Sequence, residues 1–327
     1  MKALQIVKYG EIRDSLAFNE LSKPTVQAKD VLIKVKAAAI NPIDKSIILG
    51  NLQGLIPIPF PSTLAYDLSG VVVEKGDDVS HFEIGDLVYS RVPQEQMGTI
   101  AEYVAVNHMA VSKKPGNISF EEAASIPLAG LTALQSLEQV GIKENDKVLI
   151  HAGSGGVGSF AIQYAKAKGA YVYTTTSTSN VKWVKALGAD RVIDYKTEDY
   201  KTIVRDADIV FDTLGKNYTL EAFEVIKSGG KVVSVAGPID ENSARMFGMM
   251  DYKLPETLAK RISDQGASYA FVFMHPNGSH LAEIKSLIED DKIKPIIDKT
   301  YSFSESIEAF EHLATGRAKG KIVIKIS

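Results

Sequence analysis

The sequence contains no cysteine among its 327 residues. Disulfides, a thiolate nucleophile, an iron–sulfur cluster and a cysteine-ligated zinc are therefore excluded. It also lacks an excess of basic charge, because 37 Lys and Arg stand against 40 Asp and Glu, a formal net charge of −3. This balance provides no electrostatic attraction for nucleic acid or for an anionic membrane, so we expect a small-molecule partner.

Long apolar runs are absent as well, and none approaches the roughly 18 residues of a membrane span. At the N-terminus, Lys8 interrupts the apolar residues of MKALQIVKYGE, so we expect no signal-peptide core there. We therefore expect a cytoplasmic protein. Apolar residues at 45% and charged residues at 24% are typical of soluble globular proteins, and the length predicts about two domains.

The first 115 or so residues have an all-β pattern. Runs rich in β-formers are broken by turns rich in Gly, Pro and Asp, which predicts a compact barrel or sandwich. The clearest of these runs are residues 31–38, 69–74 and 101–106.

From Ser119 the period changes to that of helices, because Ser119 and Glu122 form a capping-box pattern. Strand-like runs then alternate with helical stretches, which predicts a parallel sheet covered on both faces. The expected strands are residues 147–151, 170–175, 191–194, 207–212 and 231–235, with 270–274 as a sixth. Helices at 281–290 and 304–314 and a strand at 321–326 are expected to follow.

A glycine-rich turn lies between the first of these strands and a helix. Gly153, Gly155 and Gly158 fit G-x-G-x-x-G. The first glycine permits a tight turn, the second lets backbone amides approach a pyrophosphate, and the third lets the helix pack on the strand. The order of strand, turn and helix favours a dinucleotide site over a purely structural turn. The candidate phosphate-binding residues are Gly153, Ser154, Gly155, Gly156, Val157 and Gly158.

The next strand ends without the acid that an NAD-preferring fold places on the ribose 2′-hydroxyl. Residues 171–180 read YVYTTTSTSN. The hydroxyls of Thr176 and Ser177, the amide of Asn180 and the cation of Lys182 suit a 2′-phosphate instead, which favours NADPH over NADH. The alternative is that they form a polar turn followed by a solvated helix face.

With these motifs in hand, the sequence resembles the medium-chain dehydrogenase/reductase superfamily, and within it the zinc-free quinone and enone oxidoreductases. The resemblance spans nearly the full chain and includes residues 39–44 (AINPID), 61–70 (PSTLAYDLSG), 85–88, 98–103, 126–133 and 320–323. It implies a GroES-like catalytic domain of residues 1–120, completed by 269–327, and a Rossmann domain of residues 121–268. It also places the active cleft between the two domains.

The resemblance further implies chemistry without a metal. Zinc-dependent members carry a His–Glu pair where this chain has Tyr66 and Asp67, and they also need cysteines. The six histidines show no metal-binding spacing. Because oxidation of an alcohol profits from a Lewis acid, whereas an electron-poor C=C bond or quinone needs only hydride delivery, reduction is favoured.

By the same resemblance, Asn41 faces the nicotinamide or the substrate, and Tyr66 donates a hydrogen bond to the substrate oxygen. Plant enone reductases carry a lysine two residues after the aspartate of the N-P-x-D motif. Ser46 occupies that position here and Lys45 precedes it, so both are candidates. The alternatives are that Tyr66 packs against the barrel and that Lys45 is a solvated charge.

Further cofactor contacts are carried over from the family. Thr132 is expected near the carboxamide, and Tyr195 near the 2′-phosphate or adenine. Along the nicotinamide the resemblance places Leu214, Gly215, Ala236 and Gly237, together with Phe271 and Phe273, although the two phenylalanines equally fit a buried strand.

We therefore expect an NADPH-dependent oxidoreductase that transfers hydride to a quinone or to the C=C bond of an α,β-unsaturated carbonyl. The alternative from another class is a non-catalytic NADPH-binding protein with a structural or RNA-associated role. The resemblance also implies a homodimer, in which the edge strand at 270–274 pairs across a two-fold axis.

Overall fold

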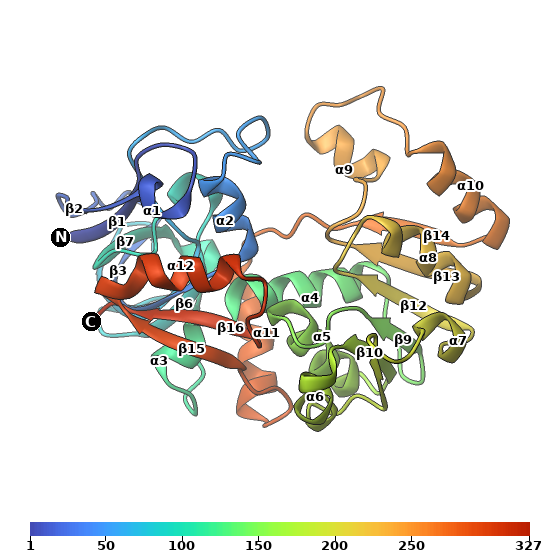
Figure 1. Ribbon diagram of the computed structural model, residues 1–327. Coiled ribbons are helices and arrows are strands. Elements are labelled where there is room, and N and C mark those ends of the chain that lie inside the picture. Colours follow the sequence, from blue (N-terminus) through green and yellow to red (C-terminus); the bar gives the residue numbers. More distant parts are fainter. The chain divides into compact units, whose positions relative to one another are not determined.

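The computed structural model describes residues 1–327, which divide into two compact units (Figure 1). The first holds Met1–Leu131, His275–Asp291 and Pro295–Ser327, and the second holds Thr132–Met274 and Lys292–Lys294. The divisions fall at 131/132 and 274/275, whereas the sequence placed them at 120/121 and 268/269. The first difference has a structural cause, because α3 (Phe120–Ala124) packs on strands of the first unit.

The first unit is built around a seven-stranded sheet in the order β15-β16-β3-β5-β6-β8, with β7 paired to β3. A smaller sheet has the order β2-β1-β4. The N-terminal third is thus β-rich, as predicted, but it is not all-β, because it also contains the helices α1 (Ile12–Ser15) and α2 (Pro42–Ile48). The strands are β1 (Lys2–Ile6), β2 (Leu16–Glu20), β3 (Asp30–Ile40), β4 (Ser62–Thr63), β5 (Asp67–Lys75), β6 (Leu87–Arg91), β7 (Tyr103–Asn107), β8 (Val111–Lys113), β15 (Ile297–Ser302) and β16 (Lys321–Lys325).

Chain segments far apart in sequence meet in this sheet. The C-terminal strand β16 pairs antiparallel with β3, with Ile322 opposite Ile40. On its other side β3 pairs with β5, with Ala39 opposite Asp67. These strands and the helices around them enclose one apolar core. The helices of this unit are α1 (Ile12–Ser15), α2 (Pro42–Ile48), α3, the start of α4 (Pro127–Gln139), α11 (Gly278–Glu289) and α12 (Ser306–Ala314).

The second unit is a six-stranded sheet in the order β11-β10-β9-β12-β13-β14, and every neighbouring pair is parallel. The predicted doubly wound sheet is confirmed, with its edge strand four residues long and ending at Phe271 rather than at 274. The strands are β9 (Lys147–Ile150), β10 (Tyr171–Thr176), β11 (Arg191–Asp194), β12 (Ala207–Asp212), β13 (Ile226–Ser234) and β14 (Ser268–Phe271).

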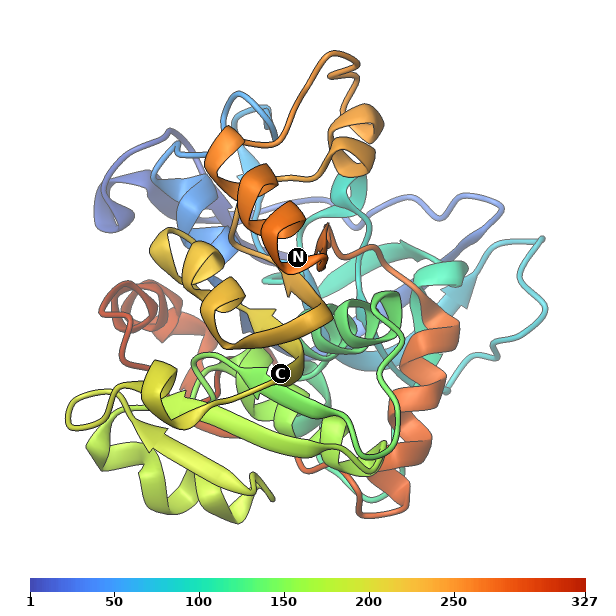
Figure 2. The same cartoon turned by 90° about the vertical axis from the view of Figure 1, so that its right-hand side faces the viewer.

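Helices cover this sheet. Helix α5 packs on β9 and β10, whereas α8 packs on β12 and β13, and α10 lies beside α8 in both views (Figures 1 and 2). Buried apolar residues of the sheet, of α8 and of α10 form a common core. The helices are α5 (Gly156–Ala167), α6 (Val181–Ala186), α7 (Tyr200–Ile203), α8 (Asn217–Val225), α9 (Glu241–Met246) and α10 (Glu256–Gln265). Across the whole chain, no helix combines the length and apolarity that crossing a membrane requires.

Candidate functional site

The glycine-rich turn leaves the carboxyl end of β9 and leads directly into α5. Gly155 is the N-cap residue of this 12-residue helix. The turn is tied to the neighbouring strand, because the Gly153 N–H donates to the Thr175 carbonyl at 2.9 Å and the Ala152 N–H donates to Thr175 Oγ1 at 3.2 Å. The turn thus lies where the strands of open parallel sheets bind ligands.

The three motif glycines meet different surroundings. A Cβ added to Gly153 would lie 2.2 Å from Thr174 Oγ1, and one added to Gly158 would lie 2.3 Å from the Ala152 carbonyl. These two glycines are required by packing inside the protein. A Cβ on Gly155 would meet only the Ala152 carbonyl, at 3.4 Å, so this position faces open space. The residues present therefore fit a pyrophosphate, which needs room for close approach at the second glycine.

The helix start supplies the donors. The first amides of an α-helix have no carbonyl partner within the helix, and α5 begins at Gly156. The amides of Gly156, Val157 and Gly158 are therefore without partners in the helix next to Gly155, and the helix dipole favours an anion at this end. Ser154 is partly exposed beside them. The six predicted residues of the cradle thus lie together at one helix N-terminus.

The loop after β10 divides its four candidate residues into two groups. Asn180 is buried and holds local structure, because its Nδ2 donates to Ser177 Oγ at 3.1 Å and its Oδ1 accepts from Trp183 Nε1 at 3.0 Å. Thr176 is buried, with no hydrogen-bond partner for its hydroxyl. Only Ser177, partly exposed, and Lys182, exposed, are open to a ligand.

Tyr195 follows β11 and lies next to this loop, because its N–H donates to the Thr176 carbonyl at 3.1 Å. Its side chain is 56% exposed, with Lys196 Nζ 5.9 Å from the ring centroid. Asp194 lies opposite Thr176 in the sheet and is the acid nearest to this loop. It already accepts a hydrogen bond from the Thr178 side chain, which lowers the pKa of its carboxyl. The exposed groups around this loop are therefore hydroxyls, an aromatic ring and lysines.

Asp212, at the end of β12, organises the two loops expected along the nicotinamide. Its Oδ1 accepts the N–H groups of Leu214 and Gly215, both at 2.9 Å. Its Oδ2 accepts the hydroxyls of Thr219 at 2.6 Å and Ser234 at 2.9 Å. The carboxylate is fully buried and every partner is a donor, so its charge is compensated in place.

Ser234 extends this hydrogen-bond network to the loop after β13. Its Oγ accepts the N–H groups of Ala236 at 3.2 Å and Gly237 at 2.8 Å. The two loops touch at Gly215, whose φ is +66° and where a Cβ would lie 2.1 Å from the Ala236 carbonyl. One buried carboxylate and one hydroxyl thus fix both loops.

An exposed apolar surface adjoins these loops at the same edge of the sheet. Phe273 follows β14 and stacks edge-to-face on Phe247, with ring centroids 5.3 Å apart. Helix α9 is anchored beside it, because the Phe271 N–H donates to Asp240 Oδ2 at 2.8 Å. The exposed members of this surface are Met246, Phe247, Met249, Met250 and Phe273, of which Met246 is 84% exposed. Phe271 is half-buried, and Thr132, in α4, is buried.

In the first unit, the candidate Asn41 directly precedes α2, and the candidates Lys45 and Ser46 lie within that helix. Asn41 is its N-cap residue and is buried. Its Nδ2 donates to Asp67 Oδ2 at 2.9 Å, and its Oδ1 accepts from Lys321 Nζ. Lys45 and Ser46 are partly exposed on α2, and neither side chain makes a hydrogen bond or ion pair. These two groups are therefore available to a ligand, whereas the Asn41 amide is largely engaged.

Asp44 lies one turn along α2 and is completely buried. Its Oδ2 accepts the Asn41 N–H at 2.7 Å, whereas its Oδ1 has no partner. Burial raises the pKa of this carboxyl to about 7, because the ionised form is poorly solvated there.

Tyr66 lies inside the core of the first unit. Its ring is fully buried, and its hydroxyl donates to Gln94 Oε1 at 2.8 Å. The buried Arg91 guanidinium lies 4.5 Å from the ring centroid. Burial raises the pKa of the Tyr66 hydroxyl, so the group stays protonated. This arrangement is that of a packed core aromatic rather than of a hydroxyl open to substrate.

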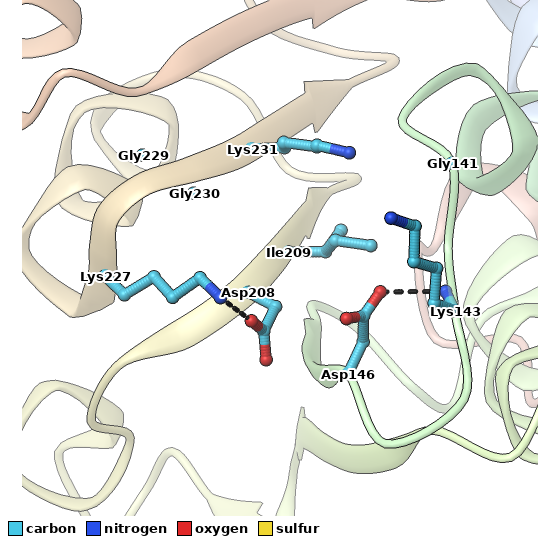
Figure 3. A pocket seen from close by; sticks show the side chains of 9 residues that line it. All are labelled: Gly141, Lys143, Asp146, Asp208, Ile209, Lys227, Gly229, Gly230 and Lys231. Carbon is cyan, nitrogen blue, oxygen red and sulfur yellow. Dashed lines mark hydrogen bonds and ion pairs between the residues drawn. The ribbon is translucent and has the colours of Figure 1, made fainter.

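A cavity of about 190 Å³ lies at the opposite, amino-terminal edge of the parallel sheet (Figure 3). Most charged groups around it are paired with one another or with the backbone: Lys227 binds Asp208, and Lys231 Nζ donates to the Val140 carbonyl at 2.6 Å. Asp146 accepts the Lys143 N–H at 2.8 Å. Because its two carboxylates, Asp146 and Asp208, and two of its three lysines are already paired, we place the candidate site at the other edge.

Four residues that organise these sites were not singled out as site residues by the sequence. Asp212, Ser234, Arg91 and Lys321 are all buried polar groups in or next to strands. A polar residue inside or bordering an otherwise apolar strand was the available signal, since such a group needs partners. No group of three or more His, Asp or Glu side chains in the chain is arranged to hold a metal ion.

Comparison with protein families gives two matches. Residues 27–116 match the alcohol dehydrogenase GroES-like domain, and residues 187–324 match the zinc-binding dehydrogenase domain. The first lies within the β-rich unit, and the second covers the later Rossmann strands and the C-terminal segment.

Similar proteins cover nearly the whole chain. A chloroplastic NADPH-dependent alkenal/one oxidoreductase of Arabidopsis thaliana is 35% identical over 99% of this chain and 79% of its own. A chloroplast envelope quinone oxidoreductase homolog of the same plant is 31% identical over 99% and 98%. The quinone oxidoreductase structure from Coxiella burnetii superimposes with a TM-score of 0.86 at 34% identity, covering 100% and 99%.

The cradle at α5 and these full-length similarities agree with each other. A nicotinamide cofactor fits the glycine-rich turn, and the relatives are named as oxidoreductases. The chain is therefore an oxidoreductase that belongs to the medium-chain dehydrogenase/reductase family, within its group of quinone oxidoreductases and enone reductases.

Proposed function

We propose that the protein is an NADPH-dependent reductase of small electrophiles, either α,β-unsaturated carbonyl compounds or quinones. The observation that carries the proposal is the open cradle at Gly155, within a chain whose relatives are named for these substrates. With an enone, NADPH and one proton yield NADP⁺ and the saturated ketone. With a quinone, NADPH and one proton likewise yield NADP⁺ and the hydroquinone, since the hydride supplies both electrons and one of the two hydrogens.

The cofactor, when bound, supplies hydride to an electron-poor carbon. The residues of the second unit bind and orient it. The amides of Gly156, Val157 and Gly158 hold the pyrophosphate. Ser177, Lys182 and Tyr195 surround the adenosine 2′-phosphate, which supports NADPH over NADH because the loop after β10 offers no acid to a ribose hydroxyl. Asn180 acts indirectly, by holding Ser177.

The loops held by Asp212 and Ser234 shape the nicotinamide end. Leu214, Gly215, Ala236 and Gly237 line it with backbone whose conformation is fixed by buried hydrogen bonds. Thr132 and Phe271 complete the predicted contacts. The exposed methionines and Phe273 at this edge favour an apolar electrophile over a highly charged one.

The first unit supplies the polar groups for the substrate oxygen. When hydride adds to the β-carbon of an enone, negative charge develops on that oxygen, and a donor that meets it there lowers the barrier. Lys45 is our first candidate for this donor and Ser46 its rival, since both side chains are open on α2. Asn41 retains one free Nδ2 proton for the substrate or the carboxamide. We assign Tyr66 to packing, because its hydroxyl is used by Gln94.

The same proposal includes a reaction that needs no zinc, since the chain has no cysteine and carries Tyr66 and Asp67 where zinc-dependent relatives have ligands. We also propose a homodimer formed through the edge strand β14, and a cytoplasmic location. Sedimentation at micromolar concentration tests the dimer, and a single species of monomer mass would contradict it.

The activity is tested by following NADPH absorbance with a 1,4-quinone and with an aliphatic enone, and with NADH in parallel. We expect oxidation of NADPH in proportion to the acceptor, and a lower kcat/KM with NADH. Binding of NADPH without turnover across a broad panel of electrophiles would instead support a non-catalytic NADPH-binding protein.

Lys45→Met and Ser46→Ala separate the two donors. Removal of a donor to a developing oxyanion lowers turnover by about 10²-fold or more. The variant that shows this loss identifies the donor, and unchanged turnover in both would remove this face of α2 from the mechanism.

A further inference from the structure

Three chain segments distant in sequence bring polar side chains to one buried point of the first unit. Lys321 begins β16, Asn41 follows β3, and Asp67 begins β5. The three strands are neighbours in the sheet, with Ile322 opposite Ile40 and Ala39 opposite Asp67. The last strand of the chain therefore delivers a cation to a candidate site near its beginning.

The Lys321 ammonium is fully satisfied there. Its Nζ donates to the Ile40 carbonyl at 3.0 Å, to Asp67 Oδ2 at 3.3 Å and to Asn41 Oδ1. An ammonium carries three protons, so none remains for a ligand. Lys321 is 6% exposed and Asp67 is completely buried, so this pair is shielded from solvent.

Asp67 also receives only donors. Its Oδ1 accepts the Leu128 N–H at 2.8 Å, and its Oδ2 accepts Asn41 Nδ2 at 2.9 Å as well as Lys321. Burial raises the pKa of Asp67, and the Lys321 cation opposes that rise.

These contacts determine which way the Asn41 amide faces. An ammonium only donates, so the amide oxygen must face Lys321, and the amide nitrogen must then face Asp67. One Nδ2 proton engages Asp67 and one remains. Asn41 can therefore present a donor in a single, fixed direction.

We propose that Lys321 is a positioning residue of the reaction, which fixes the Asn41 amide so that its remaining N–H meets a carbonyl of the substrate or of the carboxamide. This inference rests on the proposed function, in which Asn41 is a contact residue. A purely structural role for the Lys321–Asp67 pair is the competing explanation, because removal of either charge alone leaves the other buried without its partner.

The double variant Lys321→Met/Asp67→Asn separates the two explanations. It removes both buried charges together and keeps the side-chain volumes, so it is expected to fold. Residue 67 then offers an amide N–H to Asn41, which turns the Asn41 oxygen away from its native direction. Lys325→Met is the matched control, since Lys325 lies on the same strand, is exposed and only approaches Glu121 at 3.9 Å.

Two readouts are needed. The first is the side-chain amide signal of Asn41 in protein labelled with ¹⁵N-asparagine, assigned by its loss in Asn41→Ala. We expect its two proton shifts to move in the double variant and not in Lys325→Met. The second is turnover, which is expected to fall by about 10²-fold in the double variant. The Kd for NADPH is expected to stay within threefold, because the phosphate cradle belongs to the other unit.

A double variant with wild-type turnover overturns the positioning role, and so does an unmoved Asn41 signal. Failure of the proposed function is seen separately, as absence of turnover in the wild-type protein with every acceptor. In that case the Asn41 signal still decides whether Lys321 sets the orientation of the amide.

Discussion

The phosphate cradle of the second unit and the buried network of the first unit use polar groups in opposite ways. The cradle offers backbone amides at the start of α5 and leaves open space at Gly155. In the network, Asn41, Asp67 and Lys321 satisfy one another in the interior. The cradle is arranged to bind a ligand, whereas the network fixes the positions of the protein's own side chains.

The two kinds of site also differ in how far apart in the sequence their residues lie. A phosphate cradle depends on local chain geometry, so the glycines that permit it lie within six residues. A side-chain network depends on strand pairing, so its members lie 26 and 254 positions apart, for Asn41–Asp67 and Asp67–Lys321. Substitutions in both units test this contrast.

The largest effect is expected from Gly155→Val. The added side chain points into the open space of the cradle, and its Cβ meets only one atom, at 3.4 Å, so the fold should tolerate it. We expect the Kd for NADPH to rise about 10³-fold, a loss of about 4 kcal/mol, with little change in Tm. Calorimetric titration measures the Kd. Gly158→Ala is the control and should lower Tm, because its Cβ would lie 2.3 Å from a carbonyl.

Asp44→Asn tests the interior of the first unit. The pKa of Asp44 is about 7 in the folded protein, above its unfolded value, so the folded state binds the extra proton. Stability from this group is therefore present at low pH and is lost as pH rises from about 4 to 7. The free energy of unfolding of the variant, relative to that of wild type, should therefore rise by about 3 kcal/mol from pH 5 to pH 8. Urea unfolding at both values measures it, and a constant difference would contradict the burial argument.

His151, in the second unit, should make stability depend on pH in the opposite direction. It is buried at the end of β9, and burial lowers its pKa to about 4, below the unfolded value of 6.5. The unfolded state binds the proton first, so stability is lost as pH falls below about 6.5. Between pH 7 and 5 wild type should lose about 2 kcal/mol relative to His151→Phe. Parallel pH profiles of the two proteins would refute this prediction.

Tyr66→Phe is expected to have the smallest effect. The lost hydrogen bond to Gln94 leaves a half-buried amide that water can reach, so about 1 kcal/mol of stability should disappear. Turnover should stay within threefold of wild type. If turnover instead fell by about 10²-fold at unchanged Tm, the Tyr66 hydroxyl would act on the substrate. The first unit would then, like the cradle, offer this polar group to a ligand.

Much of the fold was predictable because its signals are local. The strands at 191–194 and 207–212 were predicted to the residue, since apolar β-branched runs are bounded there by polar residues. The cap at Ser119 is also confirmed, because Glu122 lies one helical turn away and both of its hydrogen bonds form. The edge strand was predicted to begin two residues and to end three residues too late, because apolar residues continue beyond Phe271.

The polar interior was not predictable in the same way. Asn180 and Thr176 have the right chemistry for a phosphate, but burial assigns the first to Ser177 and removes the second from the surface. Asp212 was passed over because an acid after a strand has many possible partners, and only the fold shows that two loops share it. Which polar groups remain open is settled by packing.

The most direct test of hydride delivery from a cofactor in the cradle uses NADPH deuterated at C4 of the nicotinamide, with an aliphatic enone. We predict one deuterium at the β-carbon of the saturated ketone and a solvent proton at the α-carbon, and neither with Gly155→Val. NADPH oxidation that leaves no deuterium in the product, or wild-type protein that reduces neither enone nor quinone, would contradict it.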